Sequence, residues 1–204
     1  MILLNFFNPI LDALNDGKVI RTSVAFALQS LGVLSLLGGI YLFIEILKTS
    51  FDLPTKGTIG GLLLSAVIIV AILAIVQIYF YRATNIRNLG ESQFTVIPIF
   101  SILFRCFGEI YATLSLAIGV GGCLFIWFSG MNPLYVLGGM GRFLGFLSPE
   151  GTFIGGILFL TYLAVLAFIT IVVFYFLAES TVVLVDIARN IRLLSQKRDE
   201  QVKT

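Results

Sequence analysis

Four long apolar runs restrict what this chain can fold into. They cover residues 24–46, 59–81, 110–128 and 153–178. The last three contain no charged residue, and the first contains only Glu45, next to its end. A helix needs about 20 apolar residues to cross the hydrocarbon core of a bilayer, and each run is about that long or longer. Each run is therefore expected to be a transmembrane helix.

The composition agrees with a lipid environment. Hydrophobic residues make up 58% of the chain and charged residues only 12%, whereas soluble domains carry about 25% charged residues. Membrane-spanning strands would show short alternating segments instead of continuous apolar runs. The sequence thus predicts an all-α integral membrane protein with the lipid bilayer as its main partner.

We expect three parts along the chain. Residues 1–22 form a short N-terminal interfacial helix, residues 23–196 form the four-helix transmembrane domain, and residues 197–204 form a charged C-terminal tail. Residues 179–196 contain neither Gly nor Pro, so the last helix is expected to outlast its apolar run. The expected helices are 24–47, 58–82, 108–129 and 153–185, the last continuing to about residue 196.

The N-terminal helix is predicted from its end signals. Asn8 suits the N-cap, Pro9 the first helical position and Gly17 the C-terminal cap. Polar and apolar residues share the segment in a pattern typical of a helix lying flat at the headgroup level. A frayed N-terminal arm is the alternative.

The basic residues predict an orientation. Ten of the 13 Lys and Arg residues would lie on the side that holds both termini. Loops rich in Lys and Arg stay in the cytoplasm, so both termini are expected there, in an inner-membrane protein. The ten are Lys18, Arg21, Arg82, Arg87, Arg105, Arg189, Arg192, Lys197, Arg198 and Lys203, against Lys48, Lys56 and Arg142 on the other side.

An internal repeat is the most specific pattern in the sequence. Residues 83–89 (ATNIRNL) resemble residues 188–194 (ARNIRLL), and both stretches follow an even-numbered apolar run. Residues 57–61 and 151–156 are also similar. These matches favour two tandem two-helix hairpins, related as parallel repeats. Chance similarity within a small apolar alphabet is the other interpretation.

Ionisable residues near the membrane are the first place to look for function. Arg105 and Glu109 are four residues apart and share a helix face, and Glu179 is expected at similar depth on the last helix. This cluster is either a structural ion-pair group or an ion-coupling site. In both interpretations Arg105 should lie within salt-bridge reach of Glu109 or Glu179.

Small residues four positions apart predict close helix packing. Such pairs let helix backbones approach each other in a membrane. The candidate packing residues are Ser35 with Gly39, Gly61 with Ser65, Ser115 with Gly119, and Ala117 with Gly121.

The sequence shows no recognisable catalytic constellation. It has no histidine, two cysteines in or beside apolar runs, and no metal-ligand or nucleotide motif. We therefore expect no enzyme and no cofactor. The net charge of +2 does not indicate a nucleic-acid partner. The favoured function is an accessory or scaffold subunit of a membrane assembly or homo-oligomer. A small oligomeric transporter or channel is the alternative.

Overall fold

Four long helices make up the described structure. The computed structural model describes residues 17–89, 96–133, 136–137 and 152–203. The helices are α2 (Lys18–Phe51), α3 (Thr55–Arg87), α4 (Val96–Ser129) and α6 (Phe153–Lys203), and the described residues contain no strand. Each helix is long and apolar enough to cross a membrane. A helix of 34 residues, such as α2, is about 50 Å long at 1.5 Å per residue.

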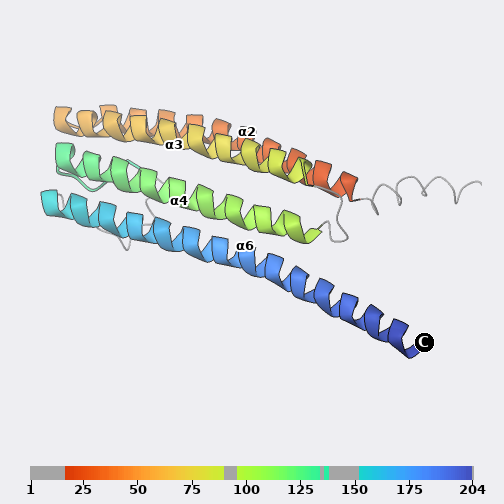
Figure 1. The fold of residues 1–204 in the computed structure, drawn as a ribbon. Coiled ribbons are helices and arrows are strands. Elements are labelled where there is room, and N and C mark those ends of the chain that lie inside the picture. The colour runs from red at the N-terminus through yellow and green to blue at the C-terminus, as the bar shows by residue number, and fades with distance from the viewer. Residues whose placement is uncertain (1–16, 90–95, 134–135, 138–151, 204) are drawn as a thin grey trace, which may run out of the picture.

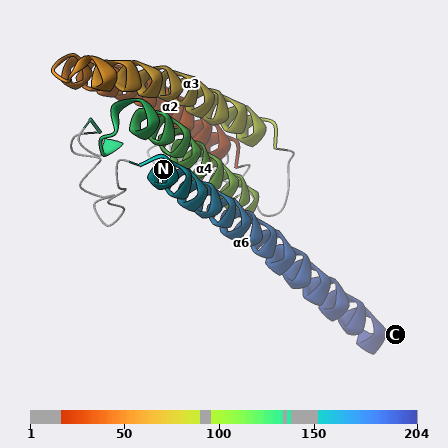
Figure 2. The same cartoon turned by 90° about the vertical axis from the view of Figure 1, so that its left-hand side faces the viewer.

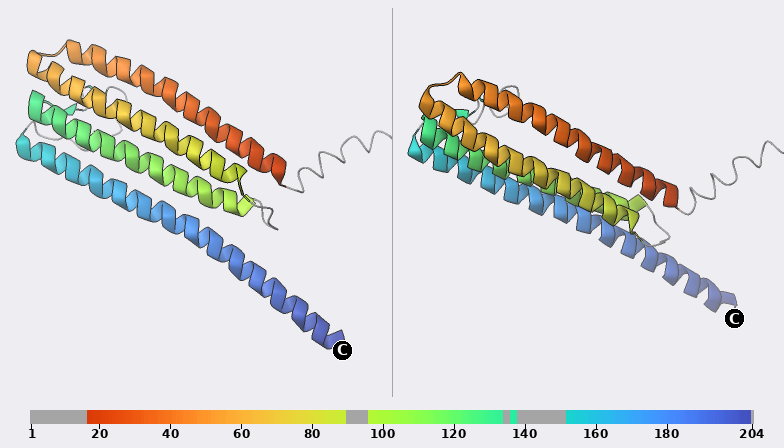
Figure 3. Two further views of the ribbon diagram at one scale, coloured as in Figure 1. Left: turned by 45° about the horizontal axis from the view of Figure 1, so that its top comes forward. Right: turned by 90° about the horizontal axis from the view of Figure 1, so that it is seen from above.

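The helices pack in chain order. α3 packs against both α2 and α4, and α6 packs against α4, whereas no other pair of the described helices makes an extensive contact. The four helices therefore lie side by side in a row, with α2 and α6 at its two edges (Figures 1 and 3). In the view of Figure 2, α2 lies partly behind α3 and α4, and α6 lies next to α4. Neighbouring helices run antiparallel (Figure 1).

Glycines stand at the places where helices approach most closely. A Cβ atom on Gly39 would lie 2.6 Å from Ile72 on the next helix, and one on Gly121 would lie 2.6 Å from Leu64. Gly61 faces Ser50 in the same manner, and Gly119 faces Leu163 at 3.1 Å. Larger side chains at these positions would hold the helices apart.

The other candidate packing residues have smaller roles in the contacts. Ser65 is 2% exposed, and its hydroxyl donates to the Gly61 carbonyl at 2.8 Å. Ala117 is buried, while Ser35 and Ser115 are partly buried.

Two groups of buried side chains fill the spaces between the helices. The first group joins all four helices and includes Ile46, Leu64, Phe125 and Phe159. The second lies toward the other end, where α2 starts and α3 ends, and draws on α2, α3 and α4. Its buried members are Ala25, Leu28, Tyr79, Ala83, Ile86, Ile99 and Cys106.

The expected start of the third helix at residue 108 is wrong. α4 begins at Val96, about three turns earlier. Pro98 is the third residue of α4, and proline is tolerated in a first turn because the N–H it lacks has no partner there. Pro98 is thus part of the helix start.

The tail and residues 18–22 also differ from expectation. α6 continues to Lys203, so residues 197–203 are helical and not a separate tail. Residues 18–22 belong to α2, and residues 1–16 of the expected interfacial helix lie outside the described residues. The proposed hairpin repeat stays a prediction.

α6 extends well past its neighbour. Ser101 of α4 contacts Ala178 of α6, and Gly122 faces Phe159, so the start of α4 lies only one or two turns beyond Ala178. The remaining 20 residues of α6, 184–203, extend about 30 Å further. In Figure 1 this end of α6 extends beyond the ends of the other three helices.

Candidate functional site

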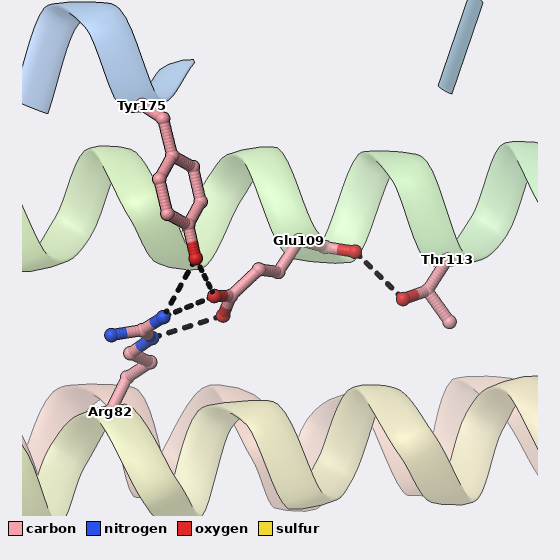
Figure 4. A network of polar contacts seen from close by, with 4 residues as sticks. All are labelled: Arg82, Glu109, Thr113 and Tyr175. Atoms are coloured by element: carbon pink, nitrogen blue, oxygen red, sulfur yellow. Dashed lines mark hydrogen bonds and ion pairs between the residues drawn. The ribbon is translucent and has the colours of Figure 1, made fainter. Parts of the chain in front are cut away.

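A polar network joins three of the four helices. Arg82 of α3, Glu109 of α4 and Tyr175 of α6 meet there (Figure 4). The Arg82 Nε–H donates to Glu109 Oε2 at 3.0 Å, and Arg82 Nη2 forms an ion pair with Glu109 Oε1. The Tyr175 hydroxyl donates to the same Oε1 at 2.7 Å. Arg82 Nη2 also reaches the Tyr175 oxygen at 3.4 Å.

Both carboxylate oxygens of Glu109 are thus engaged. Arg82 binds them as a bidentate pair. This is among the stronger hydrogen-bonding geometries in proteins, because the guanidinium matches the carboxylate in both charge and shape. The tyrosine adds a neutral donor to one of the two oxygens. The result is a closed group in which the carboxylate charge is compensated within the chain.

Burial makes this compensation important. The side chain of Arg82 is 11% exposed and that of Glu109 is 21% exposed. A partly buried charge that lost its partner would keep much of the cost of leaving water. Arg82 directly follows the apolar run 59–81, and Glu109 directly precedes the run 110–128, so both stand at the same edge of the apolar part of the molecule.

A glycine brings Tyr175 within reach of Glu109. A Cβ on Gly108 would lie 2.7 Å from the Cβ of Phe174, so only glycine lets α4 and α6 approach this closely here. Glu109 and Tyr175 are the next residues on the two helices. The Thr113 hydroxyl donates to the Glu109 main-chain carbonyl at 2.7 Å, one turn further along α4 (Figure 4).

Arg105 takes a different place from the expected one. Its guanidinium carbon lies 5.4 Å from the centre of the Tyr175 ring, a cation–π distance. Its Nε is buried and has no hydrogen-bond partner among the described residues. Arg105 forms no ion pair with Glu109 or Glu179, so the pairing predicted for it is wrong. Arg82 takes that role, because it reaches Glu109 from the neighbouring helix α3.

Glu179 lies outside the network. It is exposed on α6, one turn beyond Tyr175. The polar contact at this level is instead made by the Ser101 hydroxyl, which donates to the main-chain carbonyl of Ala178 at 3.1 Å. The structure therefore brings Arg105 and Glu109 to the same tyrosine but leaves Glu179 apart from both.

Sequence reasoning missed two members of the site. From the sequence, Arg82 is expected only as one of the basic residues on the side of the termini, although it stands at the same edge of the apolar runs as Glu109. Comparing charges across helices at equal depth would have suggested the pair. Tyr175 carries no charge and lies within an apolar run, so no sequence signal singled it out.

The described residues contain no group of three or more His, Cys, Asp or Glu side chains placed to hold a metal ion. Cys106 and Cys123 are both buried free thiols. The polar chemistry of the site is thus that of one arginine–carboxylate pair, a phenol and a second arginine.

The chain matches no protein-family model, no curated protein and no solved structure. Its function is therefore inferred from the geometry of its own residues.

The network predicts a difference between two glutamates. Glu109→Gln leaves Arg82 partly buried without its counter-charge and should lower the free energy of unfolding by about 2–4 kcal/mol, somewhat less than the loss for a fully buried pair. Glu179→Gln changes an exposed residue and should change that energy by less than about 0.5 kcal/mol. Unfolding of both purified variants in mild detergent measures the difference. Equal losses would contradict a role for the network in stability.

Proposed function

We propose that this chain is an integral inner-membrane protein that crosses the bilayer four times, with both termini in the cytoplasm. In that membrane it acts as a non-enzymatic accessory or scaffold subunit. It binds other membrane-protein subunits or further copies of itself through α6. Four helices of sufficient length and hydropathy and the bias of basic residues toward one side support the location.

The exposed surface of α6 is the observation that carries the subunit role. α6 stands at one edge of the row and packs against α4. Phe159, Leu163 and Ala167 are buried on the side toward α4. Other large side chains are open, including Phe168 at 68% and Phe176 at 67% exposure. Lipid can cover these two residues, so the decisive part of the surface is further along the helix.

The extension of α6 beyond α4 carries an apolar stripe. Leu184, Ile187, Ile191 and Leu194 are 50–67% exposed. Their spacing of three, four and three residues places them on one face of the helix, in the pattern that packs against another helix. The exposed Arg189 lies on the opposite face. We call these four apolar residues the extension stripe.

Lipid is a poor cover for the extension stripe. Residues 157–203 contain neither Gly nor Pro, the residues at which most sharp helix kinks occur. α6 accordingly runs on without a sharp bend in Figures 1 and 2, away from the apolar part of the bundle. An exposed apolar stripe outside the bilayer is typical of a protein–protein contact, which favours a partner helix.

The polar network favours the subunit role over the alternative of a small transporter or channel. An ion-coupling carboxylate has to exchange its partner during transport. Both oxygens of Glu109 are held by Arg82 and Tyr175, an arrangement suited to holding helices together.

The proposed topology predicts the behaviour of terminal fusions. An alkaline phosphatase fused after Thr204 should be inactive, because this enzyme requires the oxidising compartment outside the cytoplasm. A green fluorescent protein fused at the same position should fluoresce. An active phosphatase fusion would contradict the orientation.

The proposed contact predicts face-specific cross-linking in cells. A photoreactive amino acid at Ile191 should give a covalent adduct with a second protein chain, identified by mass spectrometry. The matched control at Arg189, two residues away on the opposite face, should give at least tenfold less. Adducts of equal yield from both positions, or no adduct from Ile191, would overturn the subunit role of α6.

A further inference from the structure

A groove lies between α2 and α4, toward the opposite edge of the row from α6. Its volume is about 490 Å³, within the usual range of small-molecule sites. α2 lines one side with Ser35, Gly38, Tyr41 and Glu45, α3 contributes Ile72, and α4 closes the other side with Leu114. The groove exists because α2 and α4 both pack against α3 and make no extensive contact with each other over their described residues.

Gly38 keeps the groove open. A Cβ atom at this position would meet no other described atom within 4 Å, in contrast to the neighbouring Gly39, which is pressed against Ile72. Ser35, Gly38 and Glu45 are spaced three and seven residues apart and share a helix face. This face of α2 therefore borders open space.

Glu45 gives the groove a charged end. It is the single charged residue of the apolar run 24–46 and is partly buried. Among the described residues, its carboxylate forms no ion pair, unlike that of Glu109. Tyr41 stands one turn away on the same side of α2 and is 70% exposed. A carboxylate beside an aromatic ring is a favourable setting for an ammonium group.

We infer that this groove binds an amphiphilic amine, with its ammonium group at Glu45 and its alkyl chain along the apolar slot toward Ser35. The distance along α2 from Ser35 to Glu45 is about 15 Å, which suits an extended alkyl chain. Among the described residues, Glu109 has an ion-pair partner and Glu45 has none. The ammonium group of the ligand would supply this opposite charge at Glu45. The same chemistry is offered by a phosphatidylethanolamine headgroup and by a free long-chain amine.

Photolabelling of the full-length protein in mild detergent tests this inference. The probe is dodecylamine with a photoreactive group at the end of its chain. It should label residues 35–45 of α2 or 110–114 of α4, and unlabelled dodecylamine should compete, whereas dodecanol should not. Labelling elsewhere, or equal competition by dodecanol, would overturn the inference.

Three variants test the roles of the Glu45 charge and of the open groove beside Gly38. Glu45→Gln keeps the shape of the side chain and should lower the labelling at least tenfold. Gly38→Leu fills the slot and should lower it similarly. Asp52→Asn removes an exposed carboxylate just beyond the same end of α2 and should leave the labelling unchanged. Unchanged labelling of Glu45→Gln would overturn the inference even where Gly38→Leu fails to fold.

Two membranes then distinguish the sources of the amine. The same probe is applied to the protein in vesicles of phosphatidylethanolamine or of phosphatidylglycerol. Loss of labelling only in phosphatidylethanolamine assigns the groove to that lipid headgroup. Labelling that persists in both assigns it to a free amphiphilic amine, and loss in both vesicles would contradict selectivity for ammonium groups.

Discussion

A carboxylate at the edge of an apolar region needs a counter-charge, and much of this structure follows from how Glu109 obtains one. Its partner Arg82 is on the preceding helix, and Tyr175 on the following helix completes the group. Sliding any of these helices by one turn, about 5.4 Å, would separate the groups. The network therefore fixes the relative heights of α3, α4 and α6.

Close packing works together with this polar contact. In the proposed bilayer location, helices gain little from the hydrophobic effect between them, so van der Waals contact and hydrogen bonds would hold them together. Gly108 allows the approach of α4 and α6 that puts Tyr175 next to Glu109. Because the helices then lie in a row and not in a closed bundle, the outer side of α6 and the groove between α2 and α4 remain open.

The sequence predicted the four long apolar helices of the described residues, because in a bilayer a continuous apolar run of spanning length leaves the backbone few other ways to satisfy its hydrogen bonds. It predicted the ends less well. The third helix begins about three turns before its expected start, with Pro98 in its first turn, where the usual objection to proline does not apply. The charged residues after 196 predicted a separate tail, yet α6 continues to Lys203.

The site was only partly predictable for a different reason. Glu109 stood out as a charge beside an apolar run, but its partner depended on which helix lies next to α4 and at what height. Arg105 shares a helix with Glu109 and was the natural choice, whereas the structure pairs Glu109 with Arg82 across the row. From the sequence, Glu45 is only a charge near the end of an apolar run. The groove beside it could not be predicted, because it depends on how three helices pack.

A double-mutant cycle on the ion pair tests the central claim most directly. The free energy of unfolding in mild detergent is measured for Arg82→Met, Glu109→Gln and the combined variant, and again with Arg105→Met in place of Arg82→Met. We expect a coupling energy of about 1–3 kcal/mol between Arg82 and Glu109, and less than about 0.5 kcal/mol between Arg105 and Glu109. Coupling confined to Arg105, or none with either arginine, would contradict the role of the network.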